Sequence, residues 1–115
     1  MDKLVYWEIP TTDLQATADF FAALFGWRME RSTDDYMMFR VDGGMGGGIQ
    51  LVEKPPGHGF MTYVQVDDIR VTLLRVTALG GRVLCEKTDI GQDYGFRASF
   101  EAPGGCRGVG LYETP

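Results

Sequence analysis

The order of apolar and polar positions predicts two similar runs of one strand, one helix and three strands. In the first run, residues 4–9 are rich in β-formers and end at Pro10, which cannot donate to a ladder. Helical spacing follows over residues 14–25, where Thr11-Thr12-Asp13 can cap the start and Gly26 can end the helix. The predicted buried face of this helix is Leu14, Ala18, Phe21 and Phe25. Strands are predicted at residues 27–31, 36–41 and 48–52.

The second half of the chain copies this order. Residues 61–66 predict a strand, Asp67-Asp68 can cap a helix, and Gly80-Gly81 can end it. The predicted buried face of this helix is Ile69, Leu73, Val76 and Leu79. Strands are predicted at residues 82–85, 94–101 and 107–112.

Short sequence motifs recur in the same order in both halves of the chain, which indicates an internal duplication. Asp13-Leu14 recurs as Asp68-Ile69, with Thr, Ala-Leu and Gly following at the same spacing. Asp35-Tyr36 recurs as Asp93-Tyr94, and the word at 48–53 recurs at 108–113. We therefore predict one domain, residues 1–115, made of a first module at 1–54, a linker at 54–59 and a second module at 60–115.

Composition excludes several classes of function. The chain of 115 residues has a net charge of −5, and its basic residues are scattered, so a nucleic-acid partner is not expected. No apolar run is long enough to span a membrane, and no export signal is visible. Two cysteines are too few for a disulfide framework, so reduced thiols and a cytoplasmic location are expected.

With these words in this order, the duplicated strand–helix–three-strand pattern resembles the glyoxalase/bleomycin-resistance/extradiol-dioxygenase superfamily, also called the vicinal oxygen chelate superfamily. The resemblance covers essentially the whole chain. The sequence segments that carry the resemblance are Val5–Pro10 with Asp13, Phe20–Trp27, Val66–Ile69, Ala78–Gly81, Ala102–Gly105 and Gly110–Glu113. It implies an α+β fold in which two βαβββ modules form a U-shaped mixed sheet around a cleft. It also implies a homodimer, and light scattering at tens of micromolar protein would test that expectation.

Metal enzymes of this superfamily carry four ligands, and the resemblance places those positions at Tyr6, Gln50, Met61 and Gly110. None of these is a histidine or a carboxylate, whereas a hard divalent ion needs several convergent oxygen or imidazole ligands. The single histidine, His58, belongs to the linker. We therefore expect no metal and no other cofactor.

Alternation along the first strand of each module defines a candidate site. Residues two apart on a strand share a face, so Tyr6 accompanies Glu8, and Met61 accompanies Tyr63. Glu8 is the candidate catalytic residue, because a carboxylate on the wall of a cleft can act as a general base or anchor a ligand by a hydrogen bond. The alternative is that Glu8 only accepts structural hydrogen bonds. The candidate cleft residues are Tyr6, Glu8, Gln50, Met61, Tyr63 and Gly110.

The glycine-rich segment 43–48 lacks the Gly-Lys-Ser/Thr ending of a phosphate-binding loop, which favours a turn between strands, with a mobile flap as the alternative. Three classes of function remain. The first is a metal-free domain that sequesters or senses a small organic molecule, which the missing ligands favour. The second is a metal-dependent lyase, isomerase or dioxygenase with an altered site. The third is a protein-interaction module. We expect binding rather than catalysis.

Overall fold

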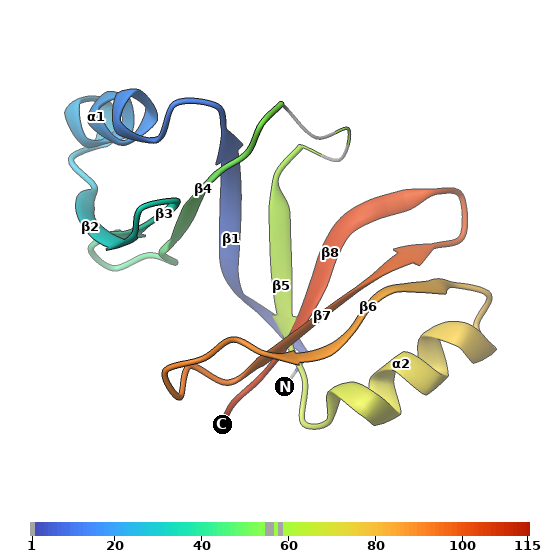
Figure 1. Cartoon of the computed structure of the whole chain (residues 1–115). Coiled ribbons are helices and arrows are strands. Elements are labelled where there is room, and N and C mark those ends of the chain that lie inside the picture. Colours follow the sequence, from blue (N-terminus) through green and yellow to red (C-terminus); the bar gives the residue numbers. More distant parts are fainter. Residues whose placement is uncertain (1, 55–56, 58) are drawn as a thin grey trace. The chain divides into compact units, whose positions relative to one another are not determined.

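A computed structural model describes residues 2–54, 57 and 59–115. Its element order confirms the predicted α+β class and the repeat of strand, helix and three strands (Figure 1). The first run is β1 (Lys3–Thr11), α1 (Leu14–Phe25), β2 (Arg28–Thr33), β3 (Tyr36–Arg40) and β4 (Gly47–Leu51). The second is β5 (Met61–Gln65), α2 (Ile69–Ala78), β6 (Arg82–Asp89), β7 (Phe96–Ala102) and β8 (Cys106–Glu113). Among the described residues, neither helix is long and apolar enough to cross a membrane.

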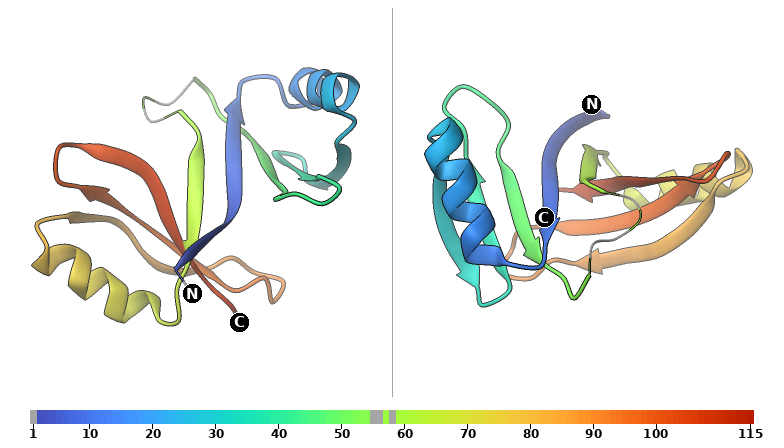
Figure 2. Two further views of the ribbon diagram at one scale, coloured as in Figure 1. Left: turned by 180° about the vertical axis from the view of Figure 1, so that it is seen from behind. Right: turned by 90° about the horizontal axis from the view of Figure 1, so that it is seen from above.

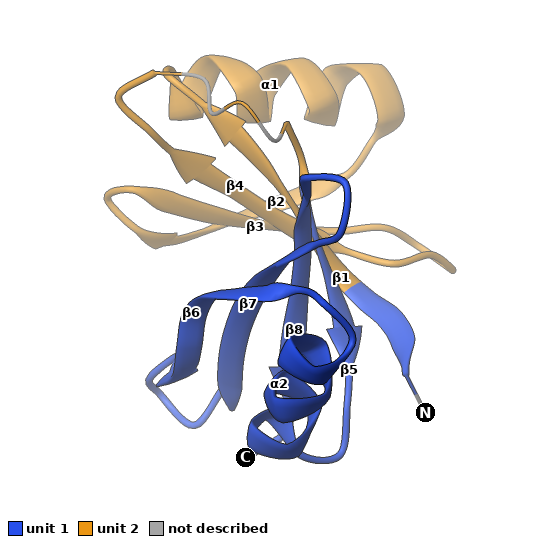
Figure 3. Cartoon of the chain, turned by 90° about the vertical axis from the view of Figure 1, so that its right-hand side faces the viewer, with its two compact units in different colours: residues 1–5, 61–115 blue, residues 6–60 orange. Residues whose placement is uncertain are grey.

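Contacts divide the chain into two compact units (Figure 3). Residues 6–60 form one, called the first module below, and Met61–Pro115 form the other, the second module. The N-terminal residues up to Val5 group with the second module rather than the first. The boundary falls at the end of the predicted linker, whose residues Pro55, Pro56 and His58 lie outside the described part of the chain.

The first module is a four-stranded mixed sheet with strand order β2-β3-β4-β1. β1 pairs with β4 in parallel, whereas β3 pairs antiparallel with both β4 and β2. In the right-hand view of Figure 2, α1 runs alongside strands of this module. The buried residues between helix and sheet are Ile9, Leu14, Ala18, Met37, Phe39 and Ile49. Because side chains alternate along a strand, the residues next to Ile9, Met37 and Ile49 lie on the other face, called here the open face.

Both ends of α1 follow the sequence rules. The Asp13 carboxylate accepts a hydrogen bond from the amide of Ala16 at 3.0 Å, which satisfies one of the amides exposed at a helix start. Gly26 ends the helix in the left-handed region, at φ 74°, which a residue without a Cβ adopts at low cost.

The second module repeats this sheet with strand order β5-β8-β7-β6. β5 pairs with β8 in parallel, and β7 pairs antiparallel with β8 and β6. The buried residues between α2 and the sheet are Val66, Ile69, Leu73, Ala98 and Leu111. Its open face is again the one that alternates with these core positions.

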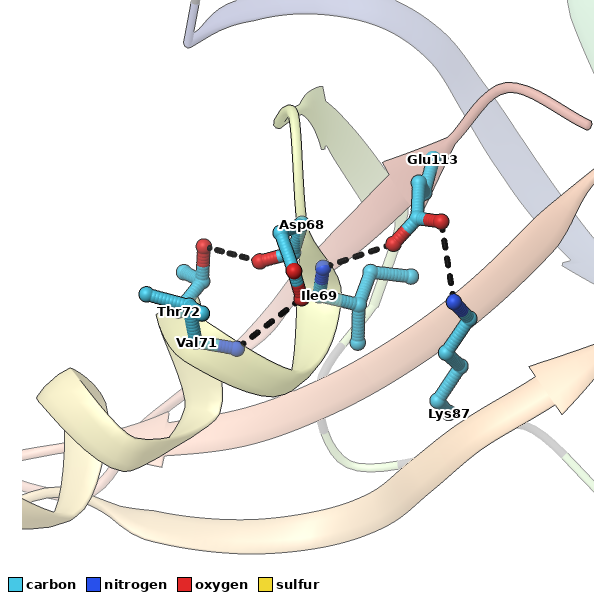
Figure 4. Close-up of polar contacts among 6 residues, drawn as sticks. All are labelled: Asp68, Ile69, Val71, Thr72, Lys87 and Glu113. Atoms are coloured by element: carbon cyan, nitrogen blue, oxygen red, sulfur yellow. Dashed lines mark hydrogen bonds and ion pairs between the residues drawn. The ribbon is translucent and has the colours of Figure 1, made fainter.

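An ionic contact joins the N-terminus of α2 to the sheet (Figure 4). One carboxylate oxygen of Glu113 accepts a hydrogen bond from the amide of Ile69 at 2.8 Å, and the other lies 2.9 Å from Lys87 Nζ. The Lys87 ammonium also lies 4.3 Å from the ring centre of Phe96. The hydrogen bond from Ile69 and the Lys87 charge hold the pKa of Glu113 below its usual value. This contact fixes β8, β6 and the first turn of α2 together.

Three details differ from the sequence analysis. β1 does not end at Pro10 but continues to Thr11, because a proline near a strand end removes only one amide from the ladder. Phe25 and Leu79 were expected on buried helix faces, yet their exposed fractions are 57% and 73%. Each lies in the last turn or at the cap of its helix, where the chain turns away from the sheet, so helical spacing alone overestimates burial there.

Candidate functional site

The open face of the first module presents two of the predicted site residues, Tyr6 and Glu8. They alternate along β1 with Trp7, which packs against the core, and with the buried Ile9. On β3, Tyr36 alternates in the same way with the buried Met37. On β4, Gly48 and Gln50 flank the fully buried Ile49. Tyr6 and Glu8 therefore share one face of β1, and the role of that face as a binding site stays a prediction.

A chain of hydrogen bonds connects three side chains of this face. The Tyr36 hydroxyl donates to Glu8 Oε2 at 2.8 Å. The hydroxyl oxygens of Tyr36 and Tyr6 lie 2.6 Å apart. Burial raises the pKa of Tyr36 far above that of an ordinary phenol, and the neighbouring Glu8 carboxylate raises it further. Tyr36 therefore stays protonated and keeps Glu8 as its acceptor.

A glycine makes room for this chain. A Cβ built on Gly48 would overlap the Tyr36 hydroxyl and would lie 2.7 Å from the hydroxyl oxygen of Tyr6. The register explains the closeness, because Gly48 pairs with Glu8 on one side and with Met38 on the other. The two phenol oxygens thus occupy the space that a side chain at this position would fill. The last two glycines of the glycine-rich segment belong to β4, not to a flap.

Gln50 lies on the same face, directly across from Tyr36 in the register of β3 and β4. Its amide nitrogen donates to the carbonyl of Leu51 at 3.2 Å and lies 3.5 Å from that of Asp35. These bonds tie Gln50 to the backbone at the end of its strand. Its contribution is to hold the start of β3 against β4, where Tyr36 begins.

In the second module, the predicted residues Tyr63 and Gly110 pair directly across β5 and β8. A Cβ on Gly110 would lie 2.7 Å from Tyr63 Cε1, so the Tyr63 ring covers this glycine. Met61 precedes Tyr63 by two residues, shares its face and is half-buried. The structure thus links Tyr6 with Glu8 through Tyr36 in the first module, and places Tyr63 beside Gly110 in the second. The convergence of both sets on one cleft stays a prediction.

The strand register corrects one correspondence between the modules. Glu8 and Tyr63, each five residues before a helix-capping aspartate, pair with Gly48 and Gly110. Gly110 is therefore the counterpart of Gly48, and the counterpart of Gln50 is Tyr112, which pairs with Gln65. Sequence matching aligned Gln50 with Gly110, two residues away.

A bulge in β8 accounts for one residue of this two-residue shift. Phe100 pairs with Val109 and Ala102 with Cys106, so two residues of β8 face one residue of β7. Gly108 lies in the bulge with φ 93°, which favours glycine. The sequence repeat aligned this bulge glycine with Gly48. Gly48 is a glycine for a different reason, because a Cβ there would overlap the Tyr36 hydroxyl.

The positions assigned to metal ligands do not fit a divalent ion. The resemblance assigns them to Tyr6 and Gln50 in the first module, and to Met61 and Gly110 in the second. A phenol, a neutral amide, a thioether and a glycine supply neither the carboxylates nor the imidazoles that such an ion prefers. In the part of the chain that the structure describes, no group of three His, Cys, Asp or Glu residues could hold an ion.

Tyr36 is the site residue that sequence reasoning missed. One signal pointed to it, because Tyr36 recurs in the Asp-Tyr motif. Alternation does not orient it, since Met37, Met38 and Phe39 are all apolar. The sequence also does not show that Tyr36 lies near Glu8, because β1 and β3 meet only through β4.

Known proteins of similar sequence carry glyoxalase names. A glyoxylase-like domain-containing protein from Didymella fabae is 30% identical over 93 residues, covering 73% of each chain. The putative glyoxylase CFP32 of Mycobacterium tuberculosis is also 30% identical, over 118 residues. That match covers 93% of this chain but 44% of the mycobacterial protein, so this chain spans less than half of that relative.

Solved structures show the same fold at lower identity. Methylmalonyl-CoA epimerase from Mycobacterium tuberculosis has a TM-score of 0.72 and 16% identity, covering 98% of this chain and 88% of its own. A member of the glyoxalase/bleomycin resistance protein/dioxygenase superfamily from Vibrio splendidus has a TM-score of 0.72 and 19% identity, covering 96% of this chain and 98% of its own. The Mn(II)-bound glyoxalase from Novosphingobium aromaticivorans has a TM-score of 0.74 and 15% identity, covering 97% of this chain and 38% of its own.

The model of the glyoxalase-like domain family matches residues 6–106, which include both helices and the open-face residues Tyr6, Glu8 and Tyr36 of the first module. The match agrees with the duplicated strand–helix–three-strand order and with the resemblance drawn from the sequence words. The chain therefore belongs to the glyoxalase-like domain family.

Proposed function

We propose that this protein binds a small organic molecule on the open face of its first module, without a divalent metal. The observation that carries the proposal is the hydrogen-bonded chain of Tyr6, Tyr36 and Glu8. It places a carboxylate and two phenols on a sheet face that the helix does not cover. A few fixed polar groups beside apolar rings are typical of small-molecule sites.

The chemistry of the ligand positions supports the metal-free part of the proposal. Similar structures include an Mn(II)-bound glyoxalase, whereas this chain carries Tyr6, Gln50, Met61 and Gly110 at the positions that the sequence resemblance assigns to metal ligands. A metal-dependent lyase, isomerase or dioxygenase is the competing function, and a homodimer is the proposed assembly. The two functions differ in a measurable way, because a resident ion stabilises the folded state that holds it.

We expect the purified protein to contain less than about 0.1 equivalents of Mn, Ni, Zn, Fe or Co by elemental analysis. We also expect its melting temperature to shift by less than about 1 °C with any of these ions at 1 mM, since a ligand that does not bind the folded state adds no stability. Stoichiometric metal together with a shift of several degrees would favour the metal enzyme instead.

We expect Glu8→Gln to weaken binding of a neutral probe, benzyl alcohol, by about 10-fold or more, because a charged acceptor contributes about 1.5–3 kcal/mol to a hydrogen bond. The amide oxygen of the variant can still accept from Tyr36, so the melting temperature should change little. The measurement is a titration followed by NMR of ring-labelled tyrosines, with Glu30→Gln as the matched control on an exposed strand of the same module. Equal affinity for wild type and Glu8→Gln would contradict the proposed site.

A further inference from the structure

An apolar hollow lies on the helix side of the second module, beside the last turns of α2. Its volume is about 310 Å³. Its apolar walls are formed by Val76 and Leu79 at the end of the helix, and by Phe100, Ala102 and Pro103 at the end of β7. A buried apolar cavity of about 150 Å³ already holds benzene, and small-molecule sites begin at about 300 Å³. The hollow is therefore large enough for a small organic molecule.

The backbone after α2 leaves this hollow unfilled. A Cβ on Gly81 would lie 2.8 Å from Cγ1 of Val76 and 3.0 Å from the carbonyl oxygen of Glu101, so the chain enters β6 close to the helix only with a glycine here. Leu79 precedes this close approach as the C-cap residue of the helix, and its exposed fraction is 73%. Leu79 thus borders the hollow as an exposed apolar side chain and does not close it.

One charged group, the guanidinium of Arg75, also borders the hollow. Four other arginines have carboxylate partners, whereas no residue that the structure describes forms an ion pair with Arg75. Thr72, which borders the hollow too, donates its hydroxyl to the carbonyl of Asp68 at 2.8 Å and is bonded to the helix backbone. The hollow thus combines apolar walls with one cation, and a guanidinium can donate two parallel hydrogen bonds to a carboxylate.

We propose that this hollow is a binding site for a small molecule with an apolar body and one carboxylate. The apolar body covers Leu79 and lies against Phe100, while the carboxylate accepts hydrogen bonds from Arg75. Removing the exposed leucine from water favours binding in proportion to the apolar area covered, and the guanidinium selects for the negative charge. This site belongs to the second module and does not depend on the function proposed for the first.

The experiment titrates the full chain with hexanoate, 1-hexanol and acetate, followed by NMR of labelled leucine and valine methyl groups. Signals of Val76 and Leu79 report on the hollow, and those of Val41 and Leu51 in the first module serve as internal references. We expect hexanoate to bind about fivefold or more tightly than 1-hexanol, which lacks the charge. Acetate lacks the apolar body and should not approach saturation at 50 mM.

Two pairs of variants separate the charge from the apolar wall. Arg75→Gln should weaken hexanoate binding by about fivefold or more and leave that of 1-hexanol within about twofold, because only the carboxylate uses the guanidinium. Its matched control is Arg70→Gln, which removes an exposed cation of the same helix outside the hollow. Leu79→Ser should weaken both ligands by about threefold or more, and Leu74→Ser, equally exposed on the same helix, should weaken neither.

The proposal is overturned if hexanoate causes no saturable shift of the Val76 and Leu79 signals at 50 mM. It is also overturned if 1-hexanol binds as tightly as hexanoate, or if Arg70→Gln and Arg75→Gln weaken hexanoate equally, since Arg75 would then not select the ligand. The function proposed for the first module is tested separately, with benzyl alcohol as the probe and tyrosine rings as the reporters. Failure of one proposal therefore leaves the other standing.

Discussion

Gly48→Ala should lower the free energy of unfolding by about 2–4 kcal/mol. The added methyl group overlaps the Tyr36 hydroxyl and crowds that of Tyr6. Forcing a methyl into a packed site costs about 1–3 kcal/mol, and displacing the Tyr36 hydroxyl also removes a hydrogen bond to a carboxylate, worth about 1.5–3 kcal/mol. Chemical denaturation monitored by circular dichroism measures the change.

Gly57→Ala is the matched control, because an added Cβ there meets nothing within 4 Å. Its stability should stay within about 0.5 kcal/mol of wild type, as for most surface substitutions. The double variant Gly48→Ala/Tyr36→Phe should recover part of the loss, since the smaller ring tip relieves the overlap. Wild-type stability of Gly48→Ala would show that Tyr36 does not occupy the space beside this glycine.

Glu113→Ala should have an effect of similar size in the second module, about 2–4 kcal/mol. The substitution removes the acceptor of the Ile69 amide at the start of α2 and leaves Lys87 without its counter-charge. Both side chains of the ion pair are more than four-fifths buried, at exposed fractions of 17% and 16%, so the loss exceeds that of a surface pair. Equilibrium unfolding in urea at pH 7 measures it, and Glu30→Gln, in an exposed pair with Arg40, should leave the midpoint unchanged.

The same contact predicts a dependence of stability on pH. Folding lowers the pKa of Glu113 below the value of 4.5 that applies to the unfolded chain, chiefly through the Ile69 amide and then through Lys87. The contribution of the ionised carboxylate is therefore complete above about pH 5 and is lost as the pH falls through the lower folded pKa. Glu113→Gln should remove this part of the acid sensitivity, so that the stabilities of wild type and variant approach each other below pH 4. A constant difference from pH 7 to pH 3 would contradict the assignment.

The repeat and the helix caps were predictable because they depend on local chemistry. Asp13 and Asp68 each supply a carboxylate three residues before an unsatisfied amide, and both cap their helices as expected. The failures lie at element ends. Leu79 matches the helical period but follows the last full turn, and Pro10 can occupy a strand whose ladder does not need its amide.

The sequence predicts only the part of the site that depends on the alternation of side chains along one strand. Tyr6 and Glu8 were placed on one face of β1, and the structure puts them there. Their partner Tyr36 comes from a strand 28 residues later, and its position depends on the register of β3 against β4. The correspondence of Gln50 with Gly110 failed for a related reason, since it depends on how β5 pairs with β8, a strand to which a bulge adds one residue. Spacing along one strand is a local property, whereas pairing between strands is not.

Both tryptophans of the chain, Trp7 and Trp27, lie in the aromatic core of the first module. Trp27 stacks on Phe39 with ring centres 4.6 Å apart, and Trp7 meets Trp27 edge-on at 6.0 Å. Indole fluorescence therefore reports on the unfolding of the first module and not on that of the second. Unfolding curves from tryptophan emission and from far-ultraviolet circular dichroism would coincide only if the two halves melt as a single cooperative unit. The uneven distribution of two residues thus turns an ordinary spectroscopic comparison into a measurement of how strongly the duplicated halves depend on each other.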